Sequence, residues 1–247
     1  MNFVDILCPS CALFLDFDGT LVDLAPQPDA VIVPSGLVHT LGELNHYLGG
    51  ALAVISGRPI EQIDAFLQPL RLPVAGVHGT ERRAFDGVVS LMSTHPLERV
   101  QEAALALAAQ HPQLRVEIKR GSVALHYRLA PELEPLCLQV MQDAVAHSPG
   151  LTLLHGKMVI EAKPRDASKG HAIEAFLHEP PFAGRMPVFV GDDFTDEVGF
   201  STVQRMQGLG IKVGEGATVA WHRLASPAAL RHELQRVVAA KSRRVNA

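Results

Sequence analysis

Cysteine is scarce in this sequence of 247 residues, which holds only Cys8, Cys11 and Cys137. An odd and low count does not make a disulfide framework, so a reducing cytoplasm is the expected setting. Cys8 and Cys11 form a C-x-x-C motif. However, a zinc site needs two further ligands, and a redox motif opens a helix after a strand, whereas this one precedes a strand. The twelve histidines are scattered, and no two lie within four residues of each other. The histidine pairs typical of zinc sites are therefore absent.

Long apolar runs and an excess of positive charge are missing as well. No apolar stretch approaches the roughly 18 residues that a membrane span needs, and the first residues lack the basic and apolar regions of a secretory signal. Nucleic-acid-binding proteins usually have a basic excess, whereas here 22 Lys and Arg face 26 Asp and Glu. We therefore expect a protein that binds neither membrane nor nucleic acid. A small phosphorylated molecule remains possible, because a few local cations can hold it. The oligomeric state stays open, and a monomer is compatible with the sequence.

What the sequence does have is apolar residues, which make up 47% of the chain and suffice for a packed core. Short apolar runs predict buried strands at 12–17, 51–55, 72–77, 187–190 and 209–213. Helical patterns lie between and after them at 60–67, 167–177, 196–206 and 228–240. Apolar strands that alternate with helices indicate an α/β protein with a Rossmann-like, doubly wound parallel sheet, covered on both faces.

The middle of the chain follows a different order. It predicts two helices, 97–110 and 132–146, among strands at 87–91, 114–119, 122–128, 151–154 and 158–163. Arg120-Gly121 and His155-Gly156 are candidate hairpin turns. Hairpins with two helices make a small α+β layer. We therefore expect a core formed by residues 1–82 and 164–247, with an α+β cap domain of residues 83–163 inserted between its halves.

The motif Asp16-Phe-Asp18-Gly19-Thr20 follows the first predicted strand. In open α/β sheets, ligands bind outside the carboxyl ends of the strands, where two carboxylates can reach one cation or one reacting centre. Gly19 permits the close backbone approach that an anion requires. An acidic turn that caps a helix would account for the same residues, so this motif alone does not decide.

Three more polar motifs stand at predicted strand or helix ends. Ser56-Gly57-Arg58 offers a hydroxyl, an amide and a cation to an anion, or simply caps a helix. Lys169-Gly170 puts a lysine near a helix start, where the dipole disfavours it unless an anion lies beside it. The run from Gly191 to Glu197 holds four acids, which repel one another unless a cation relieves them. Taken together, the motifs predict a site for Mg²⁺ and phosphate.

The order of these motifs, and Asp16-x-Asp18-Gly19-Thr20 in particular, resembles the haloacid dehalogenase superfamily of phosphotransferases, whose large α/β cap the insertion also resembles. Further motifs resemble the trehalose-6-phosphate phosphatase family over residues 13–230. They are Val77-His-Gly-Thr-Glu-Arg-Arg83, Ala124-Leu-His-Tyr-Arg128, Glu161-Ala-Lys-Pro-Arg165 with Ser168-Lys-Gly170, Val190-Gly-Asp-Asp-Phe-Thr-Asp-Glu197 and Gly214-Glu-Gly-Ala-Thr-Val-Ala220.

This resemblance implies hydrolysis of trehalose 6-phosphate to trehalose and phosphate. Asp16 would attack phosphorus and form an aspartyl-phosphate, and Asp18 would protonate the leaving oxygen and later activate water. Mg²⁺ would be held by Asp16, Asp192 and the backbone carbonyl of Asp18. Ser56 and Lys169 would bind the transferring oxygens.

Other residues would contact the substrate or support the site. In the core, these are Gly19, Thr20, Gly57, Arg58 and His78, with Arg58 undecided between a phosphate contact and a structural role. In the cap, Glu117, Lys119 and Glu161 would bind the sugar hydroxyls. Asp196 would orient neighbouring groups rather than bind the metal.

Alternatives remain at this point. One is a phosphatase for another sugar phosphate, such as sucrose phosphate or mannosyl phosphoglycerate. A receiver-like phospho-acceptor also uses clustered acids, a hydroxyl and a lysine, but receivers are about half this length and lack a cap. A catalytically silent sugar-phosphate sensor is disfavoured because acids buried without a metal role are costly.

Overall fold

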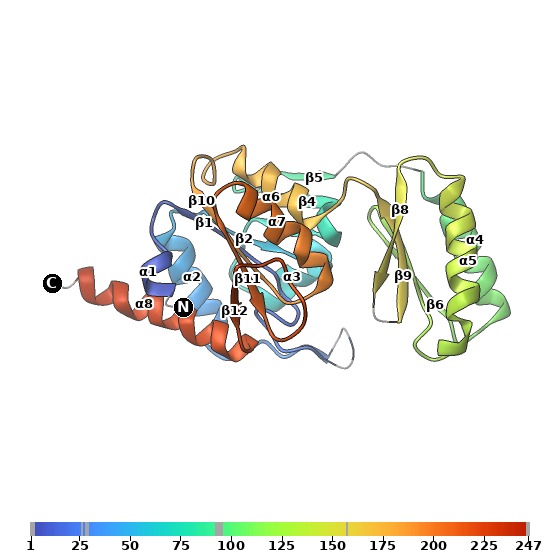
Figure 1. The fold of residues 1–247 in the computed structure, drawn as a ribbon, viewed down its shortest axis with the longest axis horizontal. Helices are drawn as coiled ribbons and strands as arrows, with labels where there is room; N and C mark the ends of the chain where they lie inside the picture. The colour runs from blue at the N-terminus through green and yellow to red at the C-terminus, as the bar shows by residue number, and fades with distance from the viewer. Residues whose placement is uncertain (1–2, 26, 28–29, 92–95, 157, 246–247) are drawn as a thin grey trace. The chain divides into compact units, whose positions relative to one another are not determined.

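The computed structural model describes residues 3–25, 27, 30–91, 96–156 and 158–245 (Figure 1). It divides into two compact units. The core unit comprises Met1–Val89 and Ser168–Ala247, and the inserted unit comprises Ser90–Ala167. Among the described residues, no helix combines the length and apolarity that crossing a membrane requires.

The core unit is built on an eight-stranded sheet with the order β12-β11-β10-β1-β2-β3-β4-β5. Six of its strands are parallel: β1 (Cys11–Leu15), β2 (Leu52–Ile55), β3 (Val74–Gly76), β10 (Met186–Gly191), β11 (Leu209–Val213) and β12 (His222–Leu224). Next to them, β4 (Glu81–Arg83) runs antiparallel to β3, and β5 (Val89–Leu91) completes the sheet.

Helices cover both faces of this sheet (Figure 1), so every residue of the central strand β1 is buried. Phe14 of β1 stacks with Phe182 and contacts Phe176 on one face, so its neighbours Leu13 and Leu15 point to the other. The helices are α1 (Phe3–Ile6), α2 (Leu37–Tyr47), α3 (Ile60–Leu67), α6 (Lys169–Leu177), α7 (Glu197–Arg205) and α8 (Pro227–Val245), with short 3₁₀ turns η2 (Val77–Gly79) and η4 (Phe194–Asp196). Helices α6 and α7 pack together, and α8 packs against α1 and α2.

The inserted unit is a four-stranded antiparallel sheet with two helices. The sheet order is β6-β7-β9-β8, formed by β6 (Arg115–Lys119), β7 (Ser122–His126), β8 (Leu151–Gly156) and β9 (Val159–Pro164). Helices α4 (Glu98–Gln110) and α5 (Glu134–Ala146), the latter preceded by η3 (Pro131–Leu133), pack against each other and against the sheet. Their apolar core includes Val123, Leu125 and Ile160. Because side chains alternate along a strand, the opposite face carries the polar residues between them.

The predicted parallel sheet and the α+β insertion are both observed, with corrections at the joints. The predicted boundaries at 82/83 and 163/164 precede the observed divisions at 89/90 and 167/168. The strand predicted at 87–91 as part of the cap is β5, in the sheet of the core. Lys119 pairs with Ser122 across the predicted turn at Arg120-Gly121. The second predicted turn falls later, because Gly156 still pairs with Val159, and residue 157 lies outside the described residues.

Candidate active site

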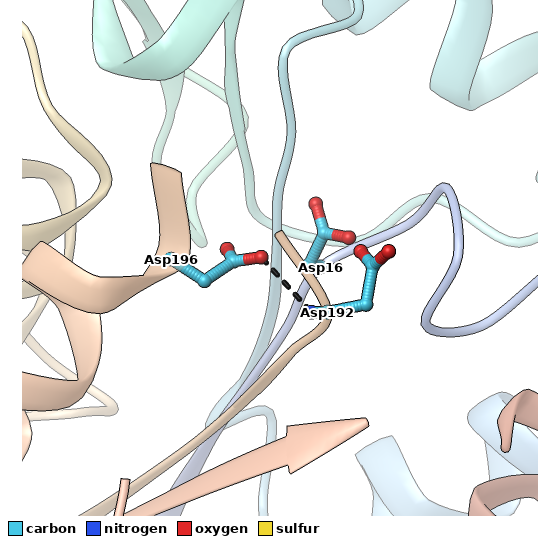
Figure 2. Close-up of side chains that lie close together, drawn as sticks. All are labelled: Asp16, Asp192 and Asp196. Atoms are coloured by element: carbon cyan, nitrogen blue, oxygen red, sulfur yellow. Dashed lines mark hydrogen bonds between the residues drawn. The ribbon is translucent and has the colours of Figure 1, made fainter. Parts of the chain in front are cut away.

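Two acidic motifs meet at the carboxyl ends of the neighbouring strands β1 and β10. Asp16 directly follows β1 and Asp192 directly follows β10, and the amide of Asp16 donates to the carbonyl of Val190 at 2.9 Å. The carboxylates of Asp16 and Asp192 lie close together, with Asp196 beside them (Figure 2). One oxygen from each of the three lies within 4.8 Å of the others. The sheet thus brings together acids that are far apart in the sequence.

Lys169 lies between two of these acids. Its Nζ donates to Asp16 Oδ1 and to Asp196 Oδ1, each at 2.7 Å, and all three side chains are buried. Burial opposes the charge of Lys169, but the carboxylates of Asp16 and Asp196 hold its pKa well above the usual range. A lysine in the first turn of α6 opposes the helix dipole. These two carboxylates therefore account for its position before any phosphate is considered.

It is unfavourable for the Asp16 and Asp192 carboxylates to be ionised at the same time. Burial raises the pKa of Asp16 well above its ordinary value, and the charges of Asp196 and Asp192 add to this while Lys169 opposes it. Burial, followed by the charge of Asp196, raises the pKa of Asp192 to about 6. A divalent cation would offset both effects. Because carboxylate oxygens are the ligands that Mg²⁺ prefers, the pair fits the predicted metal.

The carboxylate of Asp196 accepts hydrogen bonds from neighbouring backbone amides and from Lys169. Its Oδ2 accepts from the amides of Asp192 and Asp193 at 3.0 and 2.9 Å, while its Oδ1 accepts from Lys169. Asp193 caps η4 and forms a capping box with Asp196. The same carboxylate therefore fixes the turn after β10 and the ammonium of Lys169.

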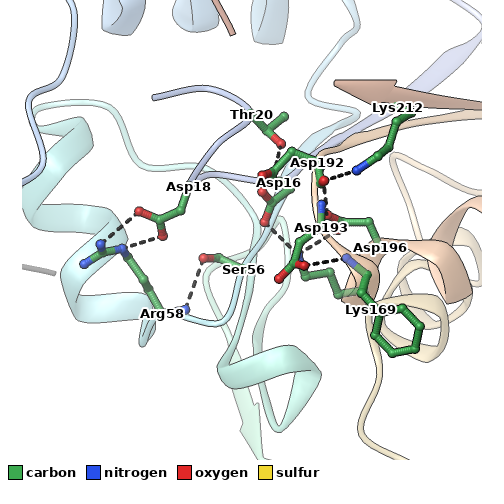
Figure 3. A network of polar contacts seen from close by, with 11 residues as sticks. Asp16, Asp18, Thr20, Ser56, Arg58, Lys169, Asp192, Asp193, Asp196 and Lys212 are labelled. Atoms are coloured by element: carbon green, nitrogen blue, oxygen red, sulfur yellow. Dashed lines mark hydrogen bonds and ion pairs between the residues drawn. The ribbon is translucent and has the colours of Figure 1, made fainter. Parts of the chain in front are cut away.

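Three further residues fix Asp192. Gly19 has a φ of +77°, and a Cβ there would lie 2.1 Å from Asp192 Oδ2, so any other residue would displace this carboxylate from its position. Thr20, fully buried, donates to Asp192 Oδ1 at 3.3 Å. Lys212 of β11 donates to the Asp192 carbonyl (Figure 3). Sequence reasoning missed Lys212. The available signal was a lysine inside an otherwise apolar strand.

Asp18 points away from this cluster and pairs with Arg58 (Figure 3). Nε and Nη2 of Arg58 donate to the two oxygens of Asp18 at 2.6 and 2.9 Å, and its guanidinium lies 5.1 Å from the ring centre of Phe66. Ser56 is buried, and its Oγ accepts from the amide of Arg58 at 3.1 Å. The Ser56-Gly57-Arg58 loop is thereby tied to the end of the first motif.

His78 is brought to the same loop by an unusual turn. Val77 and His78 have φ values of 47° and 55°, a conformation that costs energy in a β-branched residue. The amides of both residues donate to the loop, His78 to the Ser56 carbonyl at 2.9 Å. A Cβ on Gly57 would lie 2.8 Å from the His78 ring, so glycine lets the imidazole approach.

The remaining predicted residues lie on the polar face of the inserted unit. Lys119 Nζ lies 3.6 Å from Glu161 and 3.9 Å from Glu117. Glu117 also accepts from Nε2 of His126 at 3.0 Å, which is the main cause that lowers the pKa of Glu117. The two glutamates therefore share one cation across three strands.

Comparison with known proteins shows to which family the chain is similar. A family model described as trehalose-phosphatase matches residues 14–231. The chain is 45% identical over 217 residues to a trehalose-6-phosphate phosphatase of Escherichia coli (strain K12), covering 87% of this chain and 81% of that protein. It is 46% identical over 205 residues to a probable trehalose-phosphate phosphatase of Sinorhizobium fredii (strain NBRC 101917 / NGR234), covering 82% and 77%.

Solved structures agree in fold. The C-terminal domain of a trehalose-6-phosphate phosphatase from C. albicans matches with a TM-score of 0.81 at 20% identity, over 93% of this chain and 92% of that one. A haloacid dehalogenase-like hydrolase from B. subtilis matches with a TM-score of 0.68 at 14% identity, over 92% and 99%. With acids and a lysine gathered at the strand ends, and with a family model that spans most of its length, this chain belongs to the trehalose-phosphatase family.

Proposed function

We propose that this chain hydrolyses trehalose 6-phosphate to trehalose and phosphate, with Asp16 as the nucleophile. The observation that carries the proposal is the buried carboxylate of Asp16 at the end of β1, next to Lys169 and Asp192. Uncatalysed phosphomonoester hydrolysis is so slow that the site must supply well over ~20 kcal/mol. Positioning and charge neutralisation provide most of that amount in phosphoryl transfer.

The residues divide the reaction between them. Asp16 attacks phosphorus and forms the aspartyl-phosphate while the sugar oxygen leaves. Lys169 and Ser56 bind the transferring oxygens, and Asp18 protonates the leaving oxygen. Asp18 then takes a proton from water as the water oxygen attacks phosphorus, which breaks the bond to Asp16 and releases phosphate. Both oxygens of Asp18 accept bonds from Arg58. This ion pair must therefore open before Asp18 carries a proton.

Mg²⁺ would be held by Asp16, Asp192 and the backbone carbonyl of Asp18. When bound, the metal neutralises phosphate charge and lets an anionic carboxylate approach. Gly19 and Thr20 support this proposal, because they keep the Asp192 carboxylate in place.

Substrate recognition is the finer part of the proposal. Gly57 and Arg58 in the loop after β2, and His78 in the turn after β3, would contact the phosphate or the sugar. Gly19 and Thr20 would line the phosphate site. Glu117, Lys119 and Glu161 would bind sugar hydroxyls, since carboxylates accept from hydroxyls and ammonium groups donate to them. We also place the reaction in the cytoplasm, which the three free thiols support.

Phosphate release from trehalose 6-phosphate tests the proposal. We expect turnover with Mg²⁺ and none with EDTA. Sucrose phosphate and mannosyl phosphoglycerate serve as competing sugar phosphates, and p-nitrophenyl phosphate as an ester without a sugar. Faster hydrolysis of another sugar phosphate would reassign the substrate but keep the chemistry. No hydrolysis of any ester would leave a phospho-acceptor or a sensor.

The sugar-binding role is tested by Glu117→Ala and Glu161→Ala. A hydrogen bond to a charged group contributes ~1.5–3 kcal/mol, so kcat/KM for trehalose 6-phosphate should fall ~10-fold or more. Hydrolysis of p-nitrophenyl phosphate should barely change. An equal loss for both substrates would mean that the glutamates are structural, and no loss for either would mean that the sugar is bound elsewhere.

A further inference from the structure

On the polar face of the inserted sheet, the two glutamates lie on the two strands that flank β7. Ala124 of β7 pairs with Glu117 of β6 on one side and with Glu161 of β9 on the other. Ser122 and His126 lie two residues before and two residues after Ala124, so their side chains project from the same face of β7. Each of them is bonded to one of the glutamates.

Ser122 holds Glu161. The serine is fully buried, and its Oγ donates to Glu161 Oε1 at 2.6 Å. The glutamate side chain is only 6% exposed, and Lys119 Nζ lies 3.6 Å from the same oxygen. A carboxylate at this depth requires partners, because its charge is otherwise costly to bury. The hydroxyl therefore selects one rotamer of a side chain that could adopt many.

His126 holds Glu117 in the same way. Nε2 of the imidazole donates to Glu117 Oε2 at 3.0 Å. This glutamate is more exposed, at 37%, and Lys119 lies 3.9 Å from the same oxygen. An exposed glutamate has several rotamers of similar energy, and the hydrogen bond from the neighbouring strand fixes one of them.

We infer that Ser122 and His126 are positioning residues that pre-orient Glu161 and Glu117 for the hydroxyls of the sugar. This inference rests on the proposed function. Side chains that are already fixed lose less rotational freedom when the ligand binds, so the bonds strengthen ground-state binding of the sugar. Neither residue acts on the phosphate. Their effect belongs in KM rather than in kcat, and it should vanish when the glutamate that each one holds is absent.

Steady-state kinetics of the full chain tests this. For Ser122→Ala and His126→Ala, we expect KM for trehalose 6-phosphate to rise ~5- to 10-fold while kcat changes less than ~2-fold, the pattern of lost uniform binding. Parameters for p-nitrophenyl phosphate should stay at wild-type values. Thr152→Ala is the matched control, because Thr152 lies on the same sheet opposite Lys163 rather than opposite a glutamate. It should match wild type on both substrates.

Double variants decide whether the effect passes through the glutamates. Adding Ser122→Ala to Glu161→Ala, or His126→Ala to Glu117→Ala, should give no further rise in KM, because the residue that is being positioned has gone. His126→Gln, which keeps a donor, should recover part of the lost affinity. If Ser122→Ala fails to fold by circular dichroism, Ser122→Cys replaces it, with a smaller rise in KM expected from its weaker donor.

Two results would overturn the inference while the wild type still hydrolyses trehalose 6-phosphate. One is that Ser122→Ala and His126→Ala have the same KM for trehalose 6-phosphate as Thr152→Ala. The other is a full additional loss in the double variants, which would mean that Ser122 and His126 act independently of the glutamates. A wild-type chain that does not hydrolyse trehalose 6-phosphate would instead defeat the proposed function.

Discussion

Lys169 shows how one buried cation organises the site at the scale of single residues. Its ammonium separates the carboxylates of Asp16 and Asp196, which would otherwise repel each other in a buried setting. Removal of either partner would leave an uncompensated buried charge, which is strongly destabilising. Substitutions here must therefore keep hydrogen-bonding shape if they are to report on chemistry rather than on folding.

Asp16→Asn meets that condition, because the amide oxygen can still accept from Lys169. We expect kcat to fall at least ~10³-fold, since the proposed nucleophile of the covalent step is removed. The circular dichroism spectrum should remain that of the wild type. Acid quenching should trap a phosphorylated enzyme in wild type and none in the variant. Near-normal activity would contradict the covalent mechanism.

Gly19→Ala tests the room that Asp192 needs. The new Cβ would collide with the Asp192 carboxylate, so we expect a loss of activity of ~10-fold or more and a higher Mg²⁺ requirement. Gly214→Ala is the matched control, because Gly214 has the same φ of +77° and open space at its Cβ. Both variants carry similar backbone strain, of roughly 1–2 kcal/mol. An equal loss of activity in the two variants would show that backbone strain, rather than the collision with Asp192, causes the loss.

At the scale of elements, β4 is a strand that hydrophobic patterning cannot reveal. Its sequence is Glu81-Arg-Arg83, and both end residues are buried. Glu81 accepts from the amide of Ile60 at the start of α3 at 2.6 Å, and Arg83 donates to Asp64 within α3 and to the carbonyl of Leu72. These charged groups can be buried because Arg83 is paired with Asp64 and Glu81 is hydrogen-bonded to an amide of α3. Both contacts exist only after β4 and α3 come together.

The ion pair between Asp64 and Arg83 should therefore stabilise the core. We expect Asp64→Asn to lower the free energy of unfolding by ~2–4 kcal/mol in urea titrations, because Arg83 is 8% exposed and loses its counter-charge. Glu174→Gln is the control, since its pair with Arg205 is exposed and should contribute less than ~1 kcal/mol. Equal effects of the two substitutions would show that burial adds nothing to the pair.

The same pair predicts a pH dependence. Burial would raise the pKa of Asp64, but the hydrogen bonds from Arg83 and Arg71 outweigh it and hold the pKa below the ordinary value. Its contribution is then fully present above the unfolded pKa, ~3.9, and is lost as the pH falls through the folded value. The stability difference between wild type and Asp64→Asn should shrink below about pH 4. A difference that grew in acid would reverse this assignment.

The sequence predicted the elements that have a local signature and missed those that depend on distant partners. The strands β1, β2, β10 and β11 were found because strands covered on both faces are largely apolar. Helix α2 was missed. It follows Gly36 in a left-handed conformation with no side-chain cap, and its interior holds Gly42, so the usual start signals are weak.

In the candidate site too, residues with a local sequence signature were predictable, and contacts that depend on strand pairing were not. Asp16 and Asp192 were predictable because polar motifs at strand ends converge in any parallel sheet, and Lys169 because a lysine at a helix start indicates a nearby anion. The bond from Lys212 to the Asp192 carbonyl was not, since it depends on β11 lying beside β10. The ion pair of Asp18 with Arg58 likewise requires the pairing of β1 with β2.

For the whole molecule, the two carboxylates proposed to hold Mg²⁺ come from the two separate segments of the core unit, Asp16 from the first and Asp192 from the second. Mg²⁺ should therefore stabilise the folded chain as well as activate it, because a ligand that binds only the folded state raises its stability. We expect a higher melting temperature with Mg²⁺ than with EDTA. Asp192→Ala should abolish both this shift and the activity. Full activity in EDTA would exclude a metal-dependent mechanism.

The division of the core into two segments also has a consequence for biosynthesis. When β1 leaves the ribosome, β10, its partner in the centre of the sheet, has not yet been translated. At ~5–20 residues per second, β10 follows after roughly 10–30 seconds. Meanwhile, the inserted unit emerges complete, with its own apolar core. The edge of β1 that later pairs with β10 remains unpaired, and unpaired strand edges are prone to aggregation. Because Lys169, Asp192 and Asp196 all lie in the second segment, the candidate site can assemble around Asp16 only after that segment has been translated.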